Sequence, residues 1–344
     1  MDAEPKGPAS LLFGEAETVE RASRELVAQL LLHGYGLAQP PLAADDDGVR
    51  ADLTPQVARL YDRLGHQRAR RMCYCGPALA ERVDAPWEER EILQVGAELF
   101  GHGELAAAIE VASLAARLLG KAGVKDPHLT LGHAGLLKHV ARQTLPDDPE
   151  RAYEALARKD VASVLEAARP NEKAAALLRH VTAMRGAPAK LDEWFELPHA
   201  DASFPHEFRD QLKEVAGALA EQEISVSVDV TGAAGAFYHS CVSFALMSGA
   251  TILGYGGNYA TPAGHPACGF SLNARKLPGC CDAPAAEAFA AWDNYRDPAW
   301  RAAAARLIDA GRRMEVYGSE ADVPADAPSV LAADGKGGWS LESR

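Results

Sequence analysis

The sequence contains no uninterrupted apolar run of about 18 residues, the length that crosses a membrane. Its first ten residues are polar and proline-rich, and they lack the basic and apolar regions of a secretory signal peptide. The six cysteines form no C-x-x-C pair, which argues against a zinc site. We therefore expect a soluble cytoplasmic protein with free thiols, no metal ion, no cofactor and no membrane partner.

Positive charge is also scarce, because 35 lysines and arginines stand against 48 aspartates and glutamates, for a formal net charge of −13. Nucleic-acid affinity comes mainly from basic side chains that neutralise phosphates, so this surface repels a polyanion on average. The strongest local exception is the Gln-Arg-Ala-Arg-Arg run at 67–71, which we interpret as a solvated loop. We expect no nucleic-acid partner.

Hydrophobic content of 48% in 344 residues is enough for one large core or for a main domain with a small satellite. Apolar periodicity of 3.6 residues predicts helices, and alternation predicts strands. The expected helices cover 15–33, 104–119 and 300–313, and two more begin at Thr54, as a cap, and at Ala134. The expected strands cover 71–79, 92–100, 128–131, 224–230, 237–247, 251–255, 268–272, 314–317 and 339–341, with an extended piece at 35–41.

Several of these strands follow one another through short turns, which favours an antiparallel sheet. The order of helices and strands indicates an α+β protein rather than a doubly wound parallel sheet. Residues 146–222 are rich in Ala, Glu and Lys and are interpreted as a helical insertion. We predict a main domain at 1–280, including this insertion, and a small C-terminal helix-plus-strand segment at 281–344.

Four segments are informative as an ordered set. They are VRADLTPQVAR at 49–59, CYCGPAL at 73–79 with QVGAELFG at 94–101, GAFYHSCVSFA at 235–245, and GYGGNY at 254–259 with CGFSL at 268–272. In this order they resemble the histidyl-tRNA synthetase superfamily, and most closely its truncated paralogue, the regulatory subunit of ATP phosphoribosyltransferase. The resemblance runs from about residue 15 to about 277 and implies a class II aminoacyl-tRNA synthetase-like antiparallel sheet flanked by helices.

A site for a zwitterionic amino acid needs carboxylates for the ammonium group and donors for the carboxylate. An imidazole ring needs a polar group at each nitrogen. The histidine-contacting positions that the resemblance implies fall on Asp52, Thr54, Gln94, Glu98 and Tyr238, and more loosely on His239 and Tyr259. Asp52 and Glu98 are expected to hold the ammonium group, Gln94 to orient the carboxylate, and Tyr238 and His239 to meet the imidazole.

Most of these positions also have a structural explanation. Thr54 can cap a helix without binding anything, Glu98 can face solvent from its strand, and Tyr238 can be ordinary sheet packing. His133 and His239 are each more often structural histidines than ligands.

The resemblance also argues against catalysis. Class II synthetases use arginines that bind the ATP phosphates as charge moves to the leaving pyrophosphate. Two of these positions hold Ala80 and Ala234, and the third holds Lys276, one residue after Arg275. Lysine is a poor substitute for a bidentate arginine. Too few residues follow position 277 for an anticodon-binding domain.

Two departures from the family lie near the expected site. Only seven residues separate Pro41 from Val49, and the family's Gly-Gly-Arg-Tyr-Asp is Gly-Gly-Asn-Tyr-Ala here, with Asn258 and Ala260. Their position relates them to histidine binding more than to the fold.

The resemblance implies a non-catalytic regulatory subunit in histidine biosynthesis. Its implied partners are the short-form catalytic subunit of ATP phosphoribosyltransferase, a second copy of itself, and L-histidine as effector. Residues 15–33 and 54–65 are expected near the homodimer interface, which leaves the ligand face and the insertion for the catalytic subunit. The alternatives are a divergent synthetase-like ligase that activates an amino acid without tRNA, and a scaffold that binds its partner but no amino acid.

Overall fold

The computed structural model describes residues 10–43, 48–65, 70–80, 89–158, 160–167, 172–196, 204–231, 238–282 and 286–343. The chain divides into two compact units, residues 1–282 and 283–344. The division predicted from the sequence, a synthetase-like main domain at 1–280 and a C-terminal segment at 281–344, stays a prediction. The start of the basic run at 67–71 falls outside the described residues. Arg70 and Arg71 are the first residues of a strand, so the loop interpretation is wrong for them.

In the described part of the larger unit, a mixed sheet has the strand order β1-β2-β3-β9-β8-β7-β4-β6-β5. The strands are β1 Gly36–Leu37, β2 Arg70–Leu79, β3 Glu91–Phe100, β4 Pro127–His133, β5 Arg185–Gly186, β6 Val226–Asp229, β7 His239–Ser248, β8 Thr251–Ala260 and β9 Pro266–Asn273. The central ladder from β2 to β4 is antiparallel, whereas β1 joins β2 and β6 joins β4 in parallel. The α+β prediction is confirmed, with parallel additions towards both edges that the sequence did not predict.

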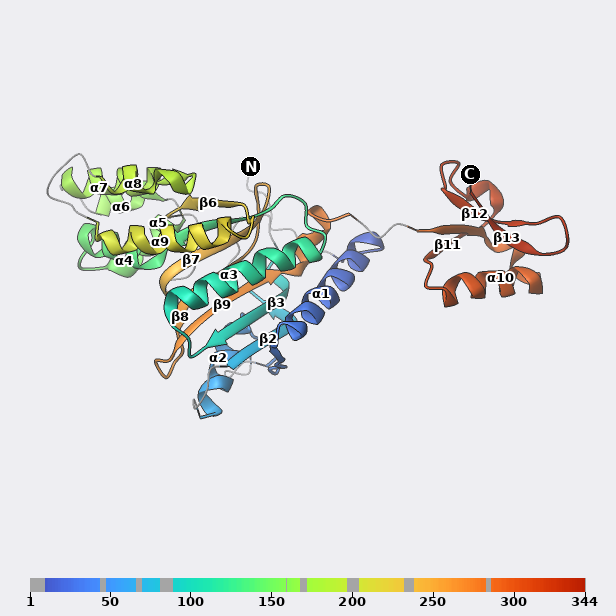
Figure 1. Ribbon diagram of the computed structural model, residues 1–344, viewed down its shortest axis with the longest axis horizontal. Helices are drawn as coiled ribbons and strands as arrows, with labels where there is room; N and C mark the ends of the chain where they lie inside the picture. The colour runs from blue at the N-terminus through green and yellow to red at the C-terminus, as the bar shows by residue number, and fades with distance from the viewer. Residues whose placement is uncertain are drawn as a thin grey trace. The chain divides into compact units, whose positions relative to one another are not determined.

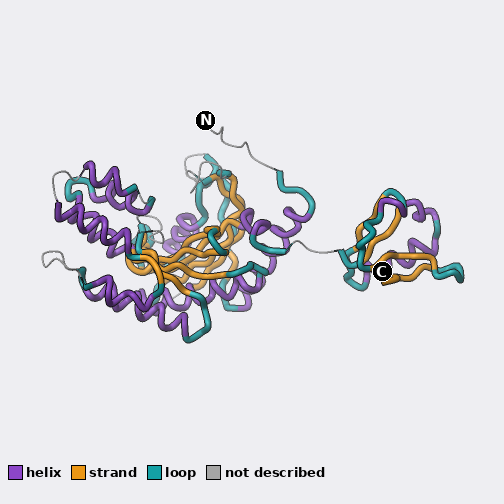
Figure 2. The backbone as a smooth tube through the Cα atoms, turned by 90° about the horizontal axis from the view of Figure 1, so that it is seen from above, coloured by secondary structure: helices purple, strands orange, loops and turns teal. Residues whose placement is uncertain are grey.

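Two long helices, α1 Gly14–Leu32 and α3 Glu104–Lys121, lie across one face of this sheet (Figures 1 and 2). Alternation along β3 explains which face they cover. Val95, Ala97 and Leu99 are fully buried in the core that includes both helices, as their alternating positions predict. The residues at the alternate positions, which include Gln94 and Glu98, therefore point to the opposite face.

The predicted helical insertion contains α5 Pro149–Ala157, α6 Val161–Ala167, α7 Glu172–Ala183, α8 Leu191–Phe195 and α9 His206–Ala220. It is not wholly helical, because β5 pairs with β6 and extends the sheet. Helix α5 packs against α4 Ala134–Thr144, and α4 packs against β7. The insertion is thus tied to the central sheet through α4.

The smaller unit is a four-stranded sheet in the order β11-β10-β12-β13 with one longer helix, α10 Pro298–Asp309. Its strands are β10 Ala288–Ala291, β11 Met314–Tyr317, β12 Ser329–Ala333 and β13 Trp339–Ser343. The sequence predicted α10, β11 and β13 but missed β10 and β12. Strand β10 (Ala-Phe-Ala-Ala) is parallel to both neighbours and buried along its whole length, so it has no alternation to detect.

Helix α2 Thr54–Arg63 begins where expected, but Thr54 is its first helical residue and not its cap. The cap prediction is therefore wrong. Asp52 accepts the hydrogen bond from the Thr54 backbone nitrogen at 2.9 Å and so satisfies one of the unpaired donors at this helix end.

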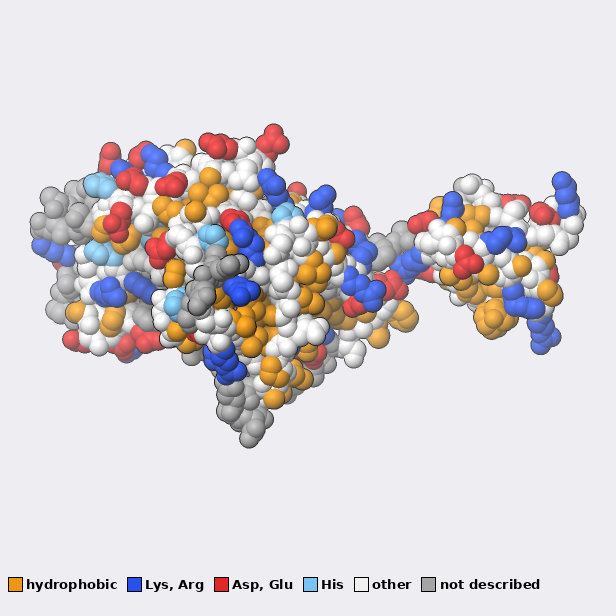
Figure 3. Space-filling model, turned by 60° about the horizontal axis from the view of Figure 1, so that its bottom comes forward, with side chains coloured by type: hydrophobic (Ala, Val, Ile, Leu, Met, Phe, Trp, Pro, Cys, Tyr) orange, Lys and Arg blue, Asp and Glu red, His pale blue; other side chains and the backbone are white. Residues whose placement is uncertain are grey.

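All six cysteines are free, as expected; five are buried and Cys75 is partly buried. No helix among the described residues is long and apolar enough to cross a membrane. Positive and negative side chains are interspersed over the face of the larger unit that Figure 3 shows.

Candidate functional site

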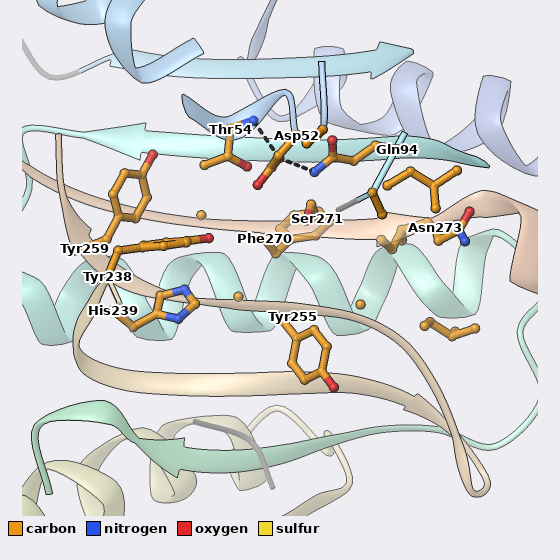
Figure 4. A pocket seen from close by; sticks show the side chains of 18 of the residues that line it. Asp52, Thr54, Gln94, Tyr238, His239, Tyr255, Tyr259, Phe270, Ser271 and Asn273 are labelled. Carbon is orange, nitrogen blue, oxygen red and sulfur yellow. Dashed lines mark hydrogen bonds between the residues drawn. The ribbon is translucent and has the colours of Figure 1, made fainter. Parts of the chain in front are cut away.

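A cavity of about 510 Å³ is lined by residues from the α2 entry loop and from strands β3, β8 and β9. All seven residues predicted from the sequence line it: Asp52, Thr54, Gln94, Glu98, Tyr238, His239 and Tyr259. Figure 4 shows Asp52, Thr54 and Gln94 on one side, with the rings of Tyr238, His239 and Tyr259 at one end. The structure therefore brings together residues that lie more than 200 positions apart in the sequence; their binding role stays a prediction.

One side of the cavity is a hydrogen-bonded loop around Asp52. Gln94 Nε2 donates to Asp52 Oδ1 at 2.6 Å, and Gln94 Oε1 accepts from the Leu53 backbone nitrogen at 2.8 Å. Both the oxygen and the nitrogen of the Gln94 side-chain amide are used in these two bonds, so the main role of Gln94 is to position Asp52. Its expected role as the main contact of a ligand carboxylate is weakened accordingly.

The deepest polar group is Glu98, which is only 1% exposed, so the alternative that it faces solvent is wrong. Tyr74 OH donates to Glu98 Oε1 at 3.0 Å, and Tyr259 OH donates to Oε2 at 2.8 Å. Thr54 Oγ1 lies 2.8 Å from Tyr74 OH. When Glu98 is ionised, Tyr74 donates its proton to Glu98, so the Thr54 hydroxyl then donates to Tyr74.

Two glycines make room for this chain of hydrogen bonds. Gly96 of β3 lies opposite Tyr74 of β2, and Gly269 of β9 lies opposite Glu98 of β3. A Cβ atom at Gly96 would overlap the Tyr74 hydroxyl, and one at Gly269 would overlap the Glu98 carboxylate. The glycines in the quoted motifs therefore have a packing reason.

Burial raises the pKa of Glu98 to about 8, and the hydrogen bonds from Tyr259 and Tyr74 only partly oppose this rise. Near neutral pH Glu98 is consequently protonated to a large extent in the empty site. A cationic group placed beside it would favour loss of that proton.

An aromatic cluster forms the end of the cavity at the start of β7. The Tyr238 and His239 rings lie 4.6 Å apart, and Tyr238 meets Tyr259 edge to face at 5.8 Å. Tyr238 is 49% exposed, whereas His239 and Tyr259 are buried. The half-exposed Tyr238 ring is available to a ligand, so sheet packing alone does not account for it.

Comparisons with known proteins show which family the chain belongs to. The sequence model of the histidyl-tRNA synthetase family matches residues 44–277. The ATP phosphoribosyltransferase regulatory subunit of Alkalilimnicola ehrlichii is 31% identical, with 97% of this chain and 95% of that protein covered. The chain belongs to the family of ATP phosphoribosyltransferase regulatory subunits.

Two solved structures share the fold. An ATP phosphoribosyltransferase regulatory subunit/histidyl-tRNA synthetase from Bacillus halodurans has a TM-score of 0.70 at 18% identity, covering 94% of each chain. A chain of the ATP phosphoribosyl transferase (HisG:HisZ) complex from Thermotoga maritima has a TM-score of 0.59 at 16% identity, covering 75% of this chain and 97% of that one. These likenesses confirm the predicted synthetase-like fold.

Two of the three positions that correspond to the synthetase arginines, Ala80 and Lys276, lie among the described residues. Ala80 lines the cavity with a methyl group, and Lys276 lines it while its amino group donates to the Ile252 carbonyl at 3.1 Å. Arg275 is directed to Glu89, at 2.9 Å, and to Glu91, at 3.7 Å. Ala234 lies outside the described residues.

One of the departures from the family sequence, Asn258, points away from the cavity. Asn258 is on the opposite side of β8 from Tyr259, and its Nδ2 donates to the Glu104 carbonyl at the start of α3, at 2.8 Å. Neither Asn258 nor Ala260 is among the lining residues, and their effect on histidine binding stays a prediction. Residues 44–47 of the shortened region lie outside the described part.

His133 has the structural role that was the simpler interpretation. Its Nδ1 accepts from the Leu136 backbone nitrogen at 3.1 Å, so its Nε2 carries the proton and donates to Gln211 Oε1 at 2.7 Å. Burial lowers the pKa of His133 to about 4. Cys241 Sγ lies 3.9 Å from that protonated nitrogen, which cannot accept its proton, so the pair is not an activated thiol.

Sequence reasoning missed two residues that line or support the site. Tyr74 was inside a quoted motif, but its burial opposite Gly96 depends on the pairing of β2 with β3, which no local pattern reveals. Arg158, at the C-terminal end of α5, lines the cavity from the insertion. No local pattern marks it, because only the packing of the insertion brings it there.

Proposed function

We propose that this chain is the regulatory subunit of an ATP phosphoribosyltransferase that binds free histidine in the cavity and a short-form catalytic subunit elsewhere. Family membership over nearly the whole chain carries the proposal. The polar cavity, lined by the seven residues that the resemblance implies as histidine contacts, supports it. A cytoplasmic location and a place in the first step of histidine biosynthesis belong to the same proposal.

The charge of the cavity supports a role without catalysis. Adenylate formation requires preorganised positive groups where charge develops on the ATP phosphates. At this end of the cavity Ala80 is neutral, Glu89 is acidic and holds Arg275, and Lys276 is a single cation. Removing one such donor commonly reduces the rate by a factor of roughly one hundred to one thousand, so this lining is unsuited to the reaction.

The residues around Asp52 and Glu98 support histidine as the ligand. Asp52 is held by Gln94 with a carboxylate facing the cavity, where it can accept a ligand ammonium group. Tyr238 and His239 offer polar atoms to an imidazole ring at the adjacent end. Ligand ammonium groups are held most strongly through charge-assisted hydrogen bonds, and the Asp52 carboxylate can accept one.

A homodimer through the N-terminal elements is part of the proposal. Among the described residues, eight of the exposed large apolar side chains lie between positions 12 and 64: Leu12, Phe13, Leu31, Leu32, Leu37, Leu42, Val49 and Leu64. Strand β1 forms one edge of the sheet and has only two residues. Apolar exposure beside a sheet edge is typical of an association surface, and it is supplied here by α1, β1 and the segments that flank α1 and α2.

The test of the assembly is co-expression with the short catalytic subunit of the same organism, followed by size exclusion with light scattering and a phosphoribosyl-transfer assay. We expect co-elution and a rate that depends on this chain and on histidine. Separate elution together with an unchanged rate would reject the regulatory assignment.

A pyrophosphate-exchange assay separates this proposal from a divergent ligase. The regulatory subunit should give no histidine-dependent exchange above background, whereas a ligase should. A complex that assembles but binds no histidine by calorimetry, with or without the catalytic subunit, would favour the scaffold alternative.

A further inference from the structure

The proposed histidine site has an unmet requirement, since the ligand's carboxylate needs a donor. The Gln94 amide is engaged with Asp52 and with the Leu53 backbone. The Thr54 hydroxyl is engaged with Tyr74, which is bonded in turn to Glu98. Ala80 contributes no polar side chain. A carboxylate that approached these groups would meet two acids and few free donors.

Two cationic side chains line the described part of the cavity, Arg158 and Lys276. Lys276 donates to the Ile252 carbonyl on β8 and shares its end of the cavity with the acidic Glu89. Arg158 comes from a different element, the C-terminal end of α5, and lines the cavity together with Ala157 and Thr231.

The present contacts of Arg158 leave it able to bind an anion. Its Nη1 lies 3.5 Å from Glu154 Oε2, one turn earlier on the same helix, and the two side chains are 58% and 39% exposed. Asp160 is also within electrostatic range of Arg158. Exposed pairs of this i,i+4 kind contribute only about 0.3–0.5 kcal/mol. A guanidinium group has five N–H donors in a planar fork that matches a carboxylate, so one weak contact does not exhaust it.

The element that carries Arg158 is physically connected to the site. Helix α5 packs on α4, and α4 packs on β7. Lys138 of α4 donates to the His239 carbonyl at 2.6 Å, at the point where β7 enters the cavity. A ligand that joined Asp52 to Arg158 would therefore connect the α2 entry loop to the helical insertion by a second route.

We infer that Arg158 binds the carboxylate of the amino-acid ligand and so couples occupancy of the site to the position of α5. The inference rests on the proposed function, because it names how that ligand is held. The described positions that correspond to the synthetase arginines are in other elements, Ala80 directly after β2 and Lys276 in the 3-10 helix Ala274–Gly279, whereas Arg158 ends α5 in the insertion, which we expect the catalytic subunit to contact. Ligand binding then orders part of the surface that a partner contacts, which is the differential interaction that regulation by linkage requires.

The test compares two ligands on the full chain, alone and with the catalytic subunit present. L-histidine carries the carboxylate, and L-histidinol replaces it with an alcohol. Calorimetry is performed on the wild type, Arg158→Gln, Arg158→Lys and the control Arg151→Gln, an exposed arginine on the same helix that does not line the cavity. Thermal unfolding of each variant verifies that it folds.

Histidine affinity should fall about tenfold in Arg158→Gln, near the lower end for a hydrogen bond to a charged group because the pair is partly exposed. Histidinol affinity should be the same in wild type and Arg158→Gln. Arg158→Lys should recover part of the loss, and Arg151→Gln should match wild type. Hydrogen exchange should show that histidine protects the amides of α5 in wild type but not in Arg158→Gln.

Equal histidine affinity in wild type and Arg158→Gln would overturn the inference while leaving the proposed function intact. An equal loss for histidine and histidinol would also overturn it, because Arg158 would then support the helix rather than the carboxylate. Failure of wild type to bind histidine in either state would reject the histidine proposal itself and the inference with it.

Discussion

Glu98 should make the protein less stable as the pH rises. In the unfolded chain its carboxyl loses its proton near the ordinary value of 4.5, whereas in the folded protein burial keeps the proton until about pH 8. Between these values the folded state binds more protons than the unfolded state, so raising the pH favours unfolding. The contribution is fully present below pH 4.5 and is lost as the pH rises to 8.

The size of the effect follows from the two pKa values. Each pH unit in this interval removes about 1.4 kcal/mol, and the whole shift from 4.5 to about 8 corresponds to roughly 5 kcal/mol. Glu98→Gln keeps the shape and cannot ionise. Its amide can still meet the Tyr74 and Tyr259 hydroxyls, which can reverse their hydrogen bonds. The wild type should therefore lose stability relative to Glu98→Gln as the pH increases.

The measurement is urea unfolding of both proteins between pH 5 and 8.5, expressed as the difference in free energy of unfolding. Other buried titrations, such as that of His133, cancel in this difference. Glu214→Gln, at an exposed position on α9, is the matched control and should keep the pH profile of the wild type. If the free energies of unfolding of wild type and Glu98→Gln changed in parallel with pH, the reasoning would be refuted, because the pKa of Glu98 would then be the same in the folded and unfolded states.

Three further predictions follow from the site and its supports. Histidine affinity should rise with pH between 6 and 8, because an ammonium group beside Glu98 favours its ionised form. Calorimetry in buffers of different ionisation enthalpy should detect the proton released on binding, and a pH profile of affinity that Glu98→Gln leaves unchanged would contradict this. Tyr74→Phe should lower the free energy of unfolding by about 1–3 kcal/mol, since it leaves a buried Glu98 oxygen and the Thr54 hydroxyl without a partner. The control is Tyr317→Phe, because the Tyr317 hydroxyl donates to the partly exposed Glu315; this variant should change the free energy of unfolding much less in the same urea titration. Arg50→Gln should lower the free energy of unfolding by about 3 kcal/mol or more, because Arg50 is 5% exposed and donates to the carbonyls of Pro40, Pro41 and Pro77. The control is Arg63→Gln, at an exposed position on α2, and equal urea midpoints for the two variants would show that these bonds contribute nothing.

The motifs in the sequence located the candidate site well, because its framework is built from short local patterns. Alternation along β3 assigns Val95, Ala97 and Leu99 to one face and therefore Gln94 and Glu98 to the other. The order of the four segments was enough to indicate the family and the α+β class. The loss of charge at Ala80 was equally visible in the sequence, since it depends on residue identity alone.

The state of each side chain was decided only by the tertiary structure. The strand order β3-β9-β8-β7 brings Tyr259 to Glu98 and turns Asn258 away from the cavity, and that order depends on pairings between distant segments. The pKa of Glu98 depends on complete burial, which no property of residues 94–101 reveals. Arg158 reaches the cavity because α5 packs on α4, across a region whose sequence indicated only helices. Local periodicity fixes which face of an element is apolar, whereas long-range packing fixes which polar groups meet and whether water reaches them.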